Sequence, residues 1–284
     1  VDFKKDVLYP SQFRDNTFNI YYPKNYNNKM PVVIWIHGGF FLTSSKEVIE
    51  VYGTLMANQN YVFIAMDYEL APESKFPNPA IQVSELILYL KDNESLYPMI
   101  DYNSFIIGGD SAGAHIASHF VGIQVNSILS NKLNIKPVLT KEEILSVILF
   151  CGPYDIHSLF PKTDIKILDV TLNLLAEQIG WAYLGNKNWK KTFDNDLLDV
   201  ISIVNNNYPP TYITDGSLDI FFKDHAIKLE NKLKQENVLV QSYYPGDTNK
   251  DIEYGHEYQF NFKTYEKEAT QNFNLLIEFL NNLL

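Results

Sequence analysis

Short apolar runs alternate with segments of helical periodicity through most of this chain, and this alternation limits the possible folds more than any other feature. The runs are rich in Val, Ile, Phe and Tyr and have the length of buried strands. They cover residues 17–22, 32–37, 61–68, 104–108, 146–151, 211–214 and 238–244. Such alternation is typical of βαβ units, in which helices connect the strands of a mostly parallel sheet. We therefore predict an α/β fold with a mostly parallel central sheet flanked by helices.

Three segments carry apolar residues three to four positions apart, as a helix packed on a sheet requires. The first lies within residues 80–90, and the second begins near Ala114. The third, at the end of the chain, places these residues on one face: Phe273, Leu276, Phe279 and Leu280. A short helix is also predicted after Thr140, because Glu143 stands at capping-box spacing from it.

Residues 156–207 interrupt this alternation. They contain a helical stretch at 174–183 but no run that resembles a strand, and a turn at 205–210 follows them. We interpret the segment as a helical insertion over the sheet. The whole chain has 284 residues, a length that suits one large domain, so we expect residues 1–284 to form a single domain.

The charge of the chain narrows the choice of partners. Its net charge is −11 and Arg14 is its only arginine, so a surface that follows phosphates is excluded and we expect no nucleic-acid partner.

No apolar run approaches eighteen residues, so we expect no membrane span. The lone Cys151 cannot form an internal disulfide or a thiolate metal cluster, which favours the cytoplasm. Because the chain begins at Val1 without methionine, a removed signal peptide and secretion stay open.

The strongest local motif is the sequence GDSAG at residues 109–113. It follows a predicted strand and precedes a predicted helix, which is the context that a G-x-S-x-G nucleophile turn requires. The glycines have a physical reason, since the serine sits on a tight turn where side chains at the flanking positions would collide with the neighbouring strand or helix. We therefore expect Ser111 to be a catalytic nucleophile.

A serine alcohol needs a base, and the base needs a carboxylate that holds its tautomer. His256 is the best candidate for the base, because it lies in a loop between the last strand and the last helix, at the carboxyl edge of the sheet. The other five histidines belong to another motif or to helical segments: His37, His115, His119, His157 and His225. For the acid, Asp215 and Asp219 both follow the strand at 211–214; Asp219 is favoured, because Asp215 precedes Gly216 and suits the turn itself.

A second loop, HGGFF at residues 37–41, directly follows the strand at 32–37. Acyl transfer passes through a tetrahedral oxyanion, and small residues allow backbone N–H groups to approach it closely. We expect the oxyanion hole to draw on Gly38, Gly39, Phe40 and Ala112. Gly38 is the residue of this set that could serve only the turn.

With these motifs, the chain resembles the hormone-sensitive-lipase-like esterases of the α/β-hydrolase fold from about residue 19 to its end. The motifs that carry the resemblance are HGGFF (37–41), DYELAPE (67–73), GDSAG (109–113), PPT (209–211) with GSLD (216–219), and HEYQF (256–260). The resemblance implies Ser111 as nucleophile, Asp219 as acid and His256 as base. It also implies a helical cap formed by residues 1 to about 18 together with the insertion at 156–207.

Three positions depart from the family pattern. Phe40 stands where the lipase-like members have a third glycine, which brings the loop closer to the HGGxW pattern of small-substrate esterases and kynurenine formamidase and narrows the pocket. Glu69 replaces the usual arginine, so any ion pair made through it is missing or reversed. Glu257 replaces the glycine after the base and brings a carboxylate near the site.

We therefore expect a serine carboxylic-ester hydrolase that acts on small or short-chain acyl esters through an acyl-enzyme, without metal or cofactor. An arylformamidase-like amide hydrolase is the alternative within the enzymes. A non-catalytic ligand-binding protein on the same scaffold is the alternative outside them. The expected partner is a small-molecule ester, and the sequence leaves monomer and homodimer both open.

Overall fold

A computed structural model describes residues 1–156, 166–222, 224–246 and 253–284. Within these residues, eight strands form one sheet in the order β1-β2-β4-β3-β5-β6-β7-β8. The strands are β1 (Asp2–Leu8), β2 (Thr17–Tyr22), β3 (Met30–Ile36), β4 (Val62–Met66), β5 (Ile100–Asp110), β6 (Ile144–Phe150), β7 (Thr211–Thr214) and β8 (Val240–Tyr243). From β4 to β8 the strands are parallel, whereas β1 and β2 add an antiparallel edge. The predicted mostly parallel α/β sheet is confirmed.

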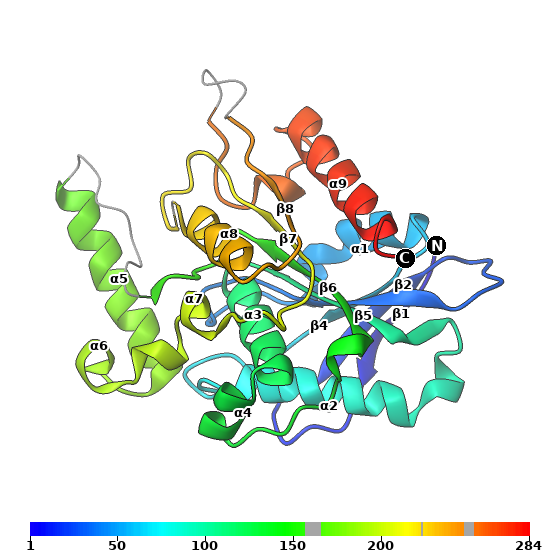
Figure 1. Cartoon of the computed structure of the whole chain (residues 1–284), viewed down its shortest axis with the longest axis horizontal. Helices are drawn as coiled ribbons and strands as arrows, with labels where there is room; N and C mark the ends of the chain where they lie inside the picture. Colours follow the sequence, from blue (N-terminus) through cyan, green and yellow to red (C-terminus); the bar gives the residue numbers. More distant parts are fainter. Residues whose placement is uncertain (157–165, 223, 247–252) are drawn as a thin grey trace.

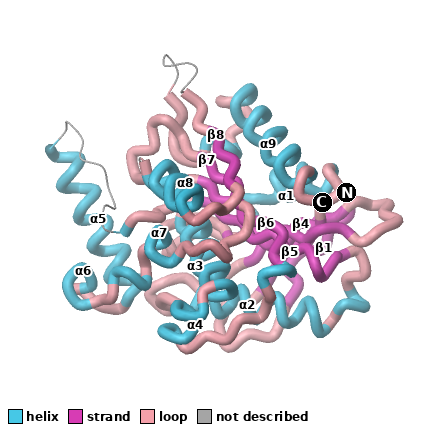
Figure 2. The backbone as a smooth tube through the Cα atoms, viewed as in Figure 1, coloured by secondary structure: helices cyan, strands magenta, loops and turns pink. Residues whose placement is uncertain are grey.

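Helices cover both faces of the sheet, so that it forms the middle of three layers (Figures 1 and 2). The helices and 3-10 turns of the body are η1 (Lys46–Ile49), α1 (Glu50–Asn58), α2 (Asn78–Asp92), η2 (Glu94–Leu96), α3 (Ala112–Val125), α4 (Ser127–Leu133), η3 (Lys141–Glu143), α8 (His225–Gln235), η6 (Tyr258–Phe260) and α9 (Glu266–Asn281). The short helix predicted after Thr140 is present as the 3-10 helix η3, and it carries the expected capping box.

The central strand β3 shows how the sequence divides the core. Its alternate residues Val32, Ile34 and Ile36 belong to the cluster under α2, α3 and α8, while Val33 and Trp35 belong to the cluster under α1 and α9. Successive side chains of a strand point to opposite faces, so a strand covered on both sides must be apolar throughout. All seven residues of β3 are accordingly buried.

The structure corrects the expectation for the first eighteen residues. The resemblance places them in a cap, but Asp2–Leu8 form the edge strand β1, which pairs antiparallel with β2 at the far side of the sheet from β8. The physical reason lies in its solvent exposure. Most residues of β1 are exposed, and the sequence DFKKDVL therefore lacks the apolar run of a buried strand.

The insertion after β6 is helical where the structure describes it. It contains α5 (Lys166–Leu184), α6 (Trp189–Thr192), η5 (Asn195–Leu197) and α7 (Val200–Ile203), and we call these four elements the cap helices. The expected helical stretch at 174–183 lies inside α5. Tyr183 joins α5 to the body, because its ring stacks on Phe41 at 3.9 Å and its carbonyl accepts a 2.9 Å hydrogen bond from the Phe76 N–H. Part of the predicted insertion, 157–165, lies outside the described residues.

Candidate active site

Ser111 lies on the turn between the end of β5 and the start of α3. Its φ of 51° and ψ of −120° place a non-glycine residue in a strained region of backbone space. The neighbouring glycines are needed for the reason that the sequence predicts. A Cβ on Gly109 would lie 2.5 Å from the Gly113 backbone, and a Cβ on Gly113 would overlap the carbonyl of Ile36 and lie 2.6 Å from that of His37. The turn therefore places Ser111 at the carboxyl edge of the sheet, where it is buried against the cavity that it lines.

His256 and Asp219 meet beside this turn. His256 Nδ1 lies 2.6 Å from Asp219 Oδ2, and the other carboxylate oxygen of Asp219 accepts hydrogen bonds from the N–H groups of Phe221 (2.7 Å) and Phe222 (3.1 Å). The Asp219 side chain is fully buried. The carboxylate thus fixes the imidazole with Nδ1 as donor, which leaves Nε2 as the acceptor that a general base needs.

The pKa directions agree with this pairing. Burial acts to lower the pKa of His256, but the hydrogen bond and the charge of Asp219 outweigh it and raise the pKa above its ordinary value. Burial acts to raise the pKa of Asp219, yet its bonds to His256 and to two backbone N–H groups lower it. Each partner therefore stabilises the charged form of the other.

Asp215, the alternative acid, has a different role in the structure. Its carboxylate accepts a 2.8 Å hydrogen bond from the Gly216 N–H, as expected of a residue that serves the turn. Burial and the nearby charge of Asp219 raise the pKa of Asp215 well above its ordinary value. Of the two candidates, the structure brings Asp219 to His256.

The loop after β3 departs from the expectation at Gly38. The Gly38 N–H donates a 2.8 Å hydrogen bond to Asp110 Oδ2, so this N–H faces away from a bound substrate. Gly39 and Phe40 both have positive φ, at 114° and 56°. Among the described residues, no acceptor is bonded to either of their N–H groups. The N–H groups of Gly39 and Phe40, together with that of Ala112 at the start of α3, are thus the ones available to an oxyanion. Gly38 does not belong to this set, because its N–H is already bonded to Asp110.

Asp110 positions the loop after β3, a role that no motif in the sequence predicts. Its other carboxylate oxygen accepts a 2.7 Å hydrogen bond from Trp35 Nε1, so one side chain links the core to the loop that begins at Gly38. The signal available in the sequence is its place between Gly109 and Ser111 in the motif. Its function could not be read there, because both partners come from β3 and the loop after it.

Glu257 brings a carboxyl group to the same place, as the departure from the family pattern suggested. Its Oε1 lies 3.7 Å from His256 Nε2, and a Cβ on Gly38 would lie 3.0 Å from that oxygen. Burial and the charge of Asp110 raise the pKa of Glu257 to about 8. Glu257 is therefore mostly neutral at pH 7, and it stands next to the nitrogen of His256 that must accept a proton.

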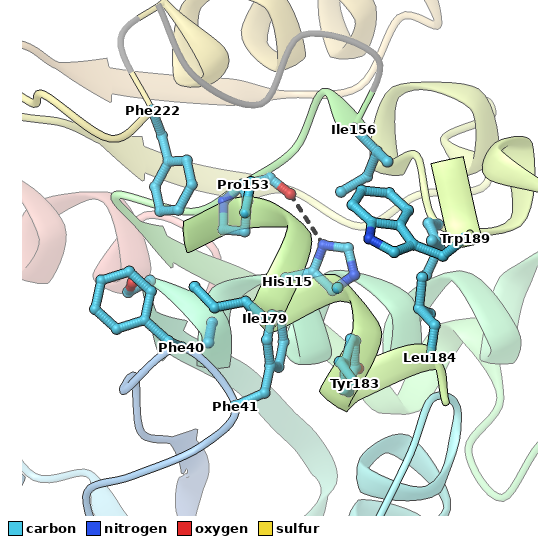
Figure 3. A pocket seen from close by; sticks show the side chains of 15 residues that line it. Phe40, Phe41, His115, Pro153, Ile156, Ile179, Tyr183, Leu184, Trp189 and Phe222 are labelled. Atoms are coloured by element: carbon cyan, nitrogen blue, oxygen red, sulfur yellow. Dashed lines mark hydrogen bonds between the residues drawn. The ribbon is translucent and has the colours of Figure 1, made fainter. Parts of the chain in front are cut away.

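A small apolar cavity opens from Ser111 under the cap helices (Figure 3). Its free volume is about 70 Å³. Its walls come from the loop after β3, from α3, from the loop after β6 and from the cap helices. The lining residues are Phe40, Phe41, Ser111, Ala112, His115, Pro153, Ile156, Ala176, Ile179, Gly180, Tyr183, Leu184, Trp189, Leu198 and Phe222. Phe40 is one of these lining residues, and its ring packs edge-on against Phe221 at 5.4 Å.

Within the described residues, one group of potential metal ligands was found: Cys151, Asp219 and His256, whose ligand atoms lie within 4.8 Å of one another. Asp219 and His256 are already bonded to each other. Cys151 is fully buried, and burial raises the pKa of its thiol well above the ordinary value. We therefore interpret the group as an acid–base pair, Asp219 and His256, with the buried thiol of Cys151 close to it.

The remaining histidines contribute to packing or lie elsewhere. His37 is buried and stacks on Tyr68 at 4.5 Å, and the Nδ1 of His225 accepts from the N–H of Tyr154 at 3.1 Å. His119 is buried next to His115, at a ring distance of 4.3 Å. His157 lies outside the described residues. No helix of the described chain is long and apolar enough to cross a membrane.

The sheet, the strained Ser111 turn and the carboxyl-edge histidine define an α/β-hydrolase fold. Esterase B from Lactobacillus Rhamnosis shares this fold with a TM-score of 0.79 and 21% identity, over 99% of this chain and 85% of that chain. The BD-FAE family model matches residues 18–233, and the chain belongs to the BD-FAE family.

Two curated relatives from Arabidopsis thaliana are similar over shorter stretches. Isoprenylcysteine alpha-carbonyl methylesterase is 28% identical over 115 residues, which cover 40% of this chain and 26% of the relative. Probable carboxylesterase 13 is 26% identical over 214 residues, which cover 69% of this chain and 62% of the relative. This chain thus spans between about a quarter and about two thirds of the length of these relatives.

Proposed function

We propose that this protein is a serine hydrolase of carboxylic esters that acts on small or short-chain acyl groups through an acyl-enzyme. The observation that carries the proposal is the 2.6 Å hydrogen bond between Asp219 and His256, beside a serine held at φ 51°. The names of the similar proteins support an ester as substrate, since they include esterase B, a methylesterase and a carboxylesterase. The small apolar cavity beside Ser111 supports a compact acyl or alcohol group.

In the proposed reaction, Ser111 Oγ attacks the ester carbonyl while His256 Nε2 takes its proton. The N–H groups of Gly39, Phe40 and Ala112 stabilise the resulting oxyanion. His256 then protonates the leaving alcohol, and the acyl group remains on Ser111. In the second half, His256 activates a water molecule, which releases the acid and restores the serine. Asp219 holds the imidazole and stabilises its charged form throughout.

Turnover of 4-nitrophenyl butyrate, together with labelling by a fluorophosphonate probe, tests the proposal. We expect both with the wild-type chain and neither with Ser111→Ala. Asp219→Asn should lower kcat by about 10⁴-fold, because the imidazole then adopts the wrong tautomer. The matched variant Asp215→Asn should retain most of the activity. The absence of both turnover and labelling in the wild type would exclude the esterase, and equal losses in the two aspartate variants would exclude Asp219 as the acid.

Amide hydrolysis of the arylformamidase kind is a second candidate, favoured by Phe40 at the position of a third glycine. The same chemistry at Ser111 would then act on a formanilide. A higher kcat/KM for a formanilide than for short nitrophenyl esters would select this candidate.

A further inference from the structure

His115 and Trp189 line the cavity on the side away from Phe40 and Phe222, as Figure 3 shows, and each ring holds one buried polar atom. His115 is 1% exposed and Trp189 is 3% exposed. Neither His115 Nε2 nor Trp189 Nε1 has a hydrogen-bond partner among the described residues. A buried polar group without a partner costs about 1 to 3 kcal/mol, so a bound molecule that supplies both partners gains affinity from them.

The hydrogen-bonding character of His115 follows from its other nitrogen. His115 Nδ1 lies 2.9 Å from the carbonyl oxygen of Pro153, and a carbonyl oxygen only accepts, so Nδ1 carries the proton. Burial and the neighbouring His119 lower the pKa of His115 well below its ordinary value, so the ring is neutral. In a neutral imidazole protonated at Nδ1, Nε2 is an acceptor.

Trp189 supplies the opposite character, because an indole Nε1–H only donates. The ring reaches the cavity from the start of α6, since α5 has a glycine where the two elements meet. A Cβ on Gly180 would overlap the Trp189 indole. Two residues of the apolar walls thus hold an unpartnered acceptor, His115 Nε2, and an unpartnered donor, Trp189 Nε1–H.

We propose that His115 and Trp189 bind a hydroxyl group of the substrate, so that this hydrolase prefers esters of hydroxylated acids or diols over their alkyl counterparts. The inference rests on the proposed esterase function and specifies its substrate class. A hydroxyl suits this pair of residues, because one O–H group can donate to an acceptor such as His115 Nε2 and accept from a donor such as Trp189 Nε1–H. An alkyl chain leaves both unpaired, and a carboxylate would place negative oxygen against the lone pair of Nε2.

Matched ester pairs test the preference and show which half of the substrate carries the hydroxyl. In the acyl arm, ethyl hydroxyhexanoates with the hydroxyl on carbons 3 to 6 are compared with ethyl hexanoate. In the alcohol arm, 4-hydroxybutyl acetate is compared with butyl acetate. We expect at least one hydroxylated ester to have a kcat/KM at least about tenfold higher than its counterpart, as measured by acid release. Equal values in both arms would overturn the proposal.

Variants assign the preference to the two side chains. Trp189→Phe removes the N–H and keeps an aromatic ring, and His115→Asn keeps a donor near the position of Nδ1 while removing Nε2. Each should bring the ratio between hydroxylated and plain ester close to one. Trp181→Phe is the matched control, because Trp181 is 44% exposed on α5 and does not line the cavity, and it should keep the wild-type ratio. A ratio that survives both cavity variants would also overturn the assignment.

Binding separates this inference from the proposed function. Calorimetric titration of Ser111→Ala with the same ester pairs should give a lower Kd for the preferred hydroxylated ester, even though this variant has no turnover. Equal affinities would contradict the hydroxyl site whether or not the wild type is an esterase. Hydrolysis of ethyl hexanoate by the wild type and not by Ser111→Ala tests the esterase function alone.

Discussion

Glu257 occupies the position after the base where the resembling esterases have glycine, and its backbone keeps a left-handed conformation with φ 58° and ψ 29°. Such a conformation favours glycine and disfavours a side chain like that of glutamate. The carboxyl group of Glu257 lies between His256 and Asp110, and Asp110 also holds the loop at Gly38. At pH 7 the raised pKa of about 8 leaves this group protonated, so it adds no charge beside the base.

We expect this carboxyl group to limit activity at alkaline pH. As pH rises, kcat/KM should first increase while His256 loses its proton. Above pH 8 Glu257 should ionise, and the negative charge it places 3.7 Å from His256 Nε2 should oppose the oxyanion that forms in the site. With a pKa of about 8, activity should fall about tenfold by pH 9.

Glu257→Gln should abolish this alkaline decline and leave the acidic limb in place, because glutamine keeps the shape of the side chain without its titration. The measurement is kcat/KM for a short-chain ester between pH 5 and 10. Glu257→Gly, which restores the family residue, should behave as glutamine does. An unchanged alkaline limb in both variants would show that another group causes the decline.

At the scale of elements, the turn between β5 and α3 depends on backbone contact that a side chain would prevent. Gly113 packs against the carbonyl groups of Ile36 and His37, at the end of the central strand β3. Strand β3 is hydrogen-bonded on both sides, to β4 and β5, so its backbone cannot shift to make room for a methyl group added at position 113. Gly113→Ala should therefore lower stability by about 3 kcal/mol or more.

Thermal unfolding checks this prediction. For a domain of this size the loss corresponds to a fall in Tm of roughly 6 to 12 °C. Gly255→Ala serves as the matched glycine variant, since a Cβ there would meet no atom within 4 Å and the backbone φ is not positive. Its Tm should stay close to that of the wild type. Equal Tm values for the two variants would mean that the turn can relax around a side chain.

For the whole molecule, the sequence predicts what is buried better than what is exposed. The inner strands are mostly apolar and buried because helices cover both of their faces, and the apolar runs predict each of them within a few residues. The sequence does not predict strand β1, because charged residues occupy most of it and its exposed positions follow no alternating pattern. In the site, Ser111, Asp219 and His256 were selected by motif and chain order. The roles of Asp110 and of the pair His115 and Trp189 depend on contacts between separate elements, which no local pattern records.

The cap helices should also unfold locally at a lower free-energy cost than the sheet. The described part of α5 has three buried residues, Leu172, Ala176 and Tyr183, whereas the sheet is buried on both faces. Tyr183 fixes α5 to the body by stacking on Phe41. Tyr183→Ala should therefore remove about 3 kcal/mol of local contact and act on the opening of α5 more than on global unfolding.

Hydrogen exchange followed by mass spectrometry distinguishes the two effects. In Tyr183→Ala, amides of α5 should exchange about a hundredfold faster, because about 3 kcal/mol corresponds to a factor of that order, while those of β3 and β5 keep their protection. The wider cavity should also shift the preferred nitrophenyl ester toward longer acyl chains. Tyr183→Phe keeps the stacked ring and should match the wild type in both measurements. Faster exchange spread equally over α5 and the central strands would instead show that the cap and the sheet unfold as one cooperative unit.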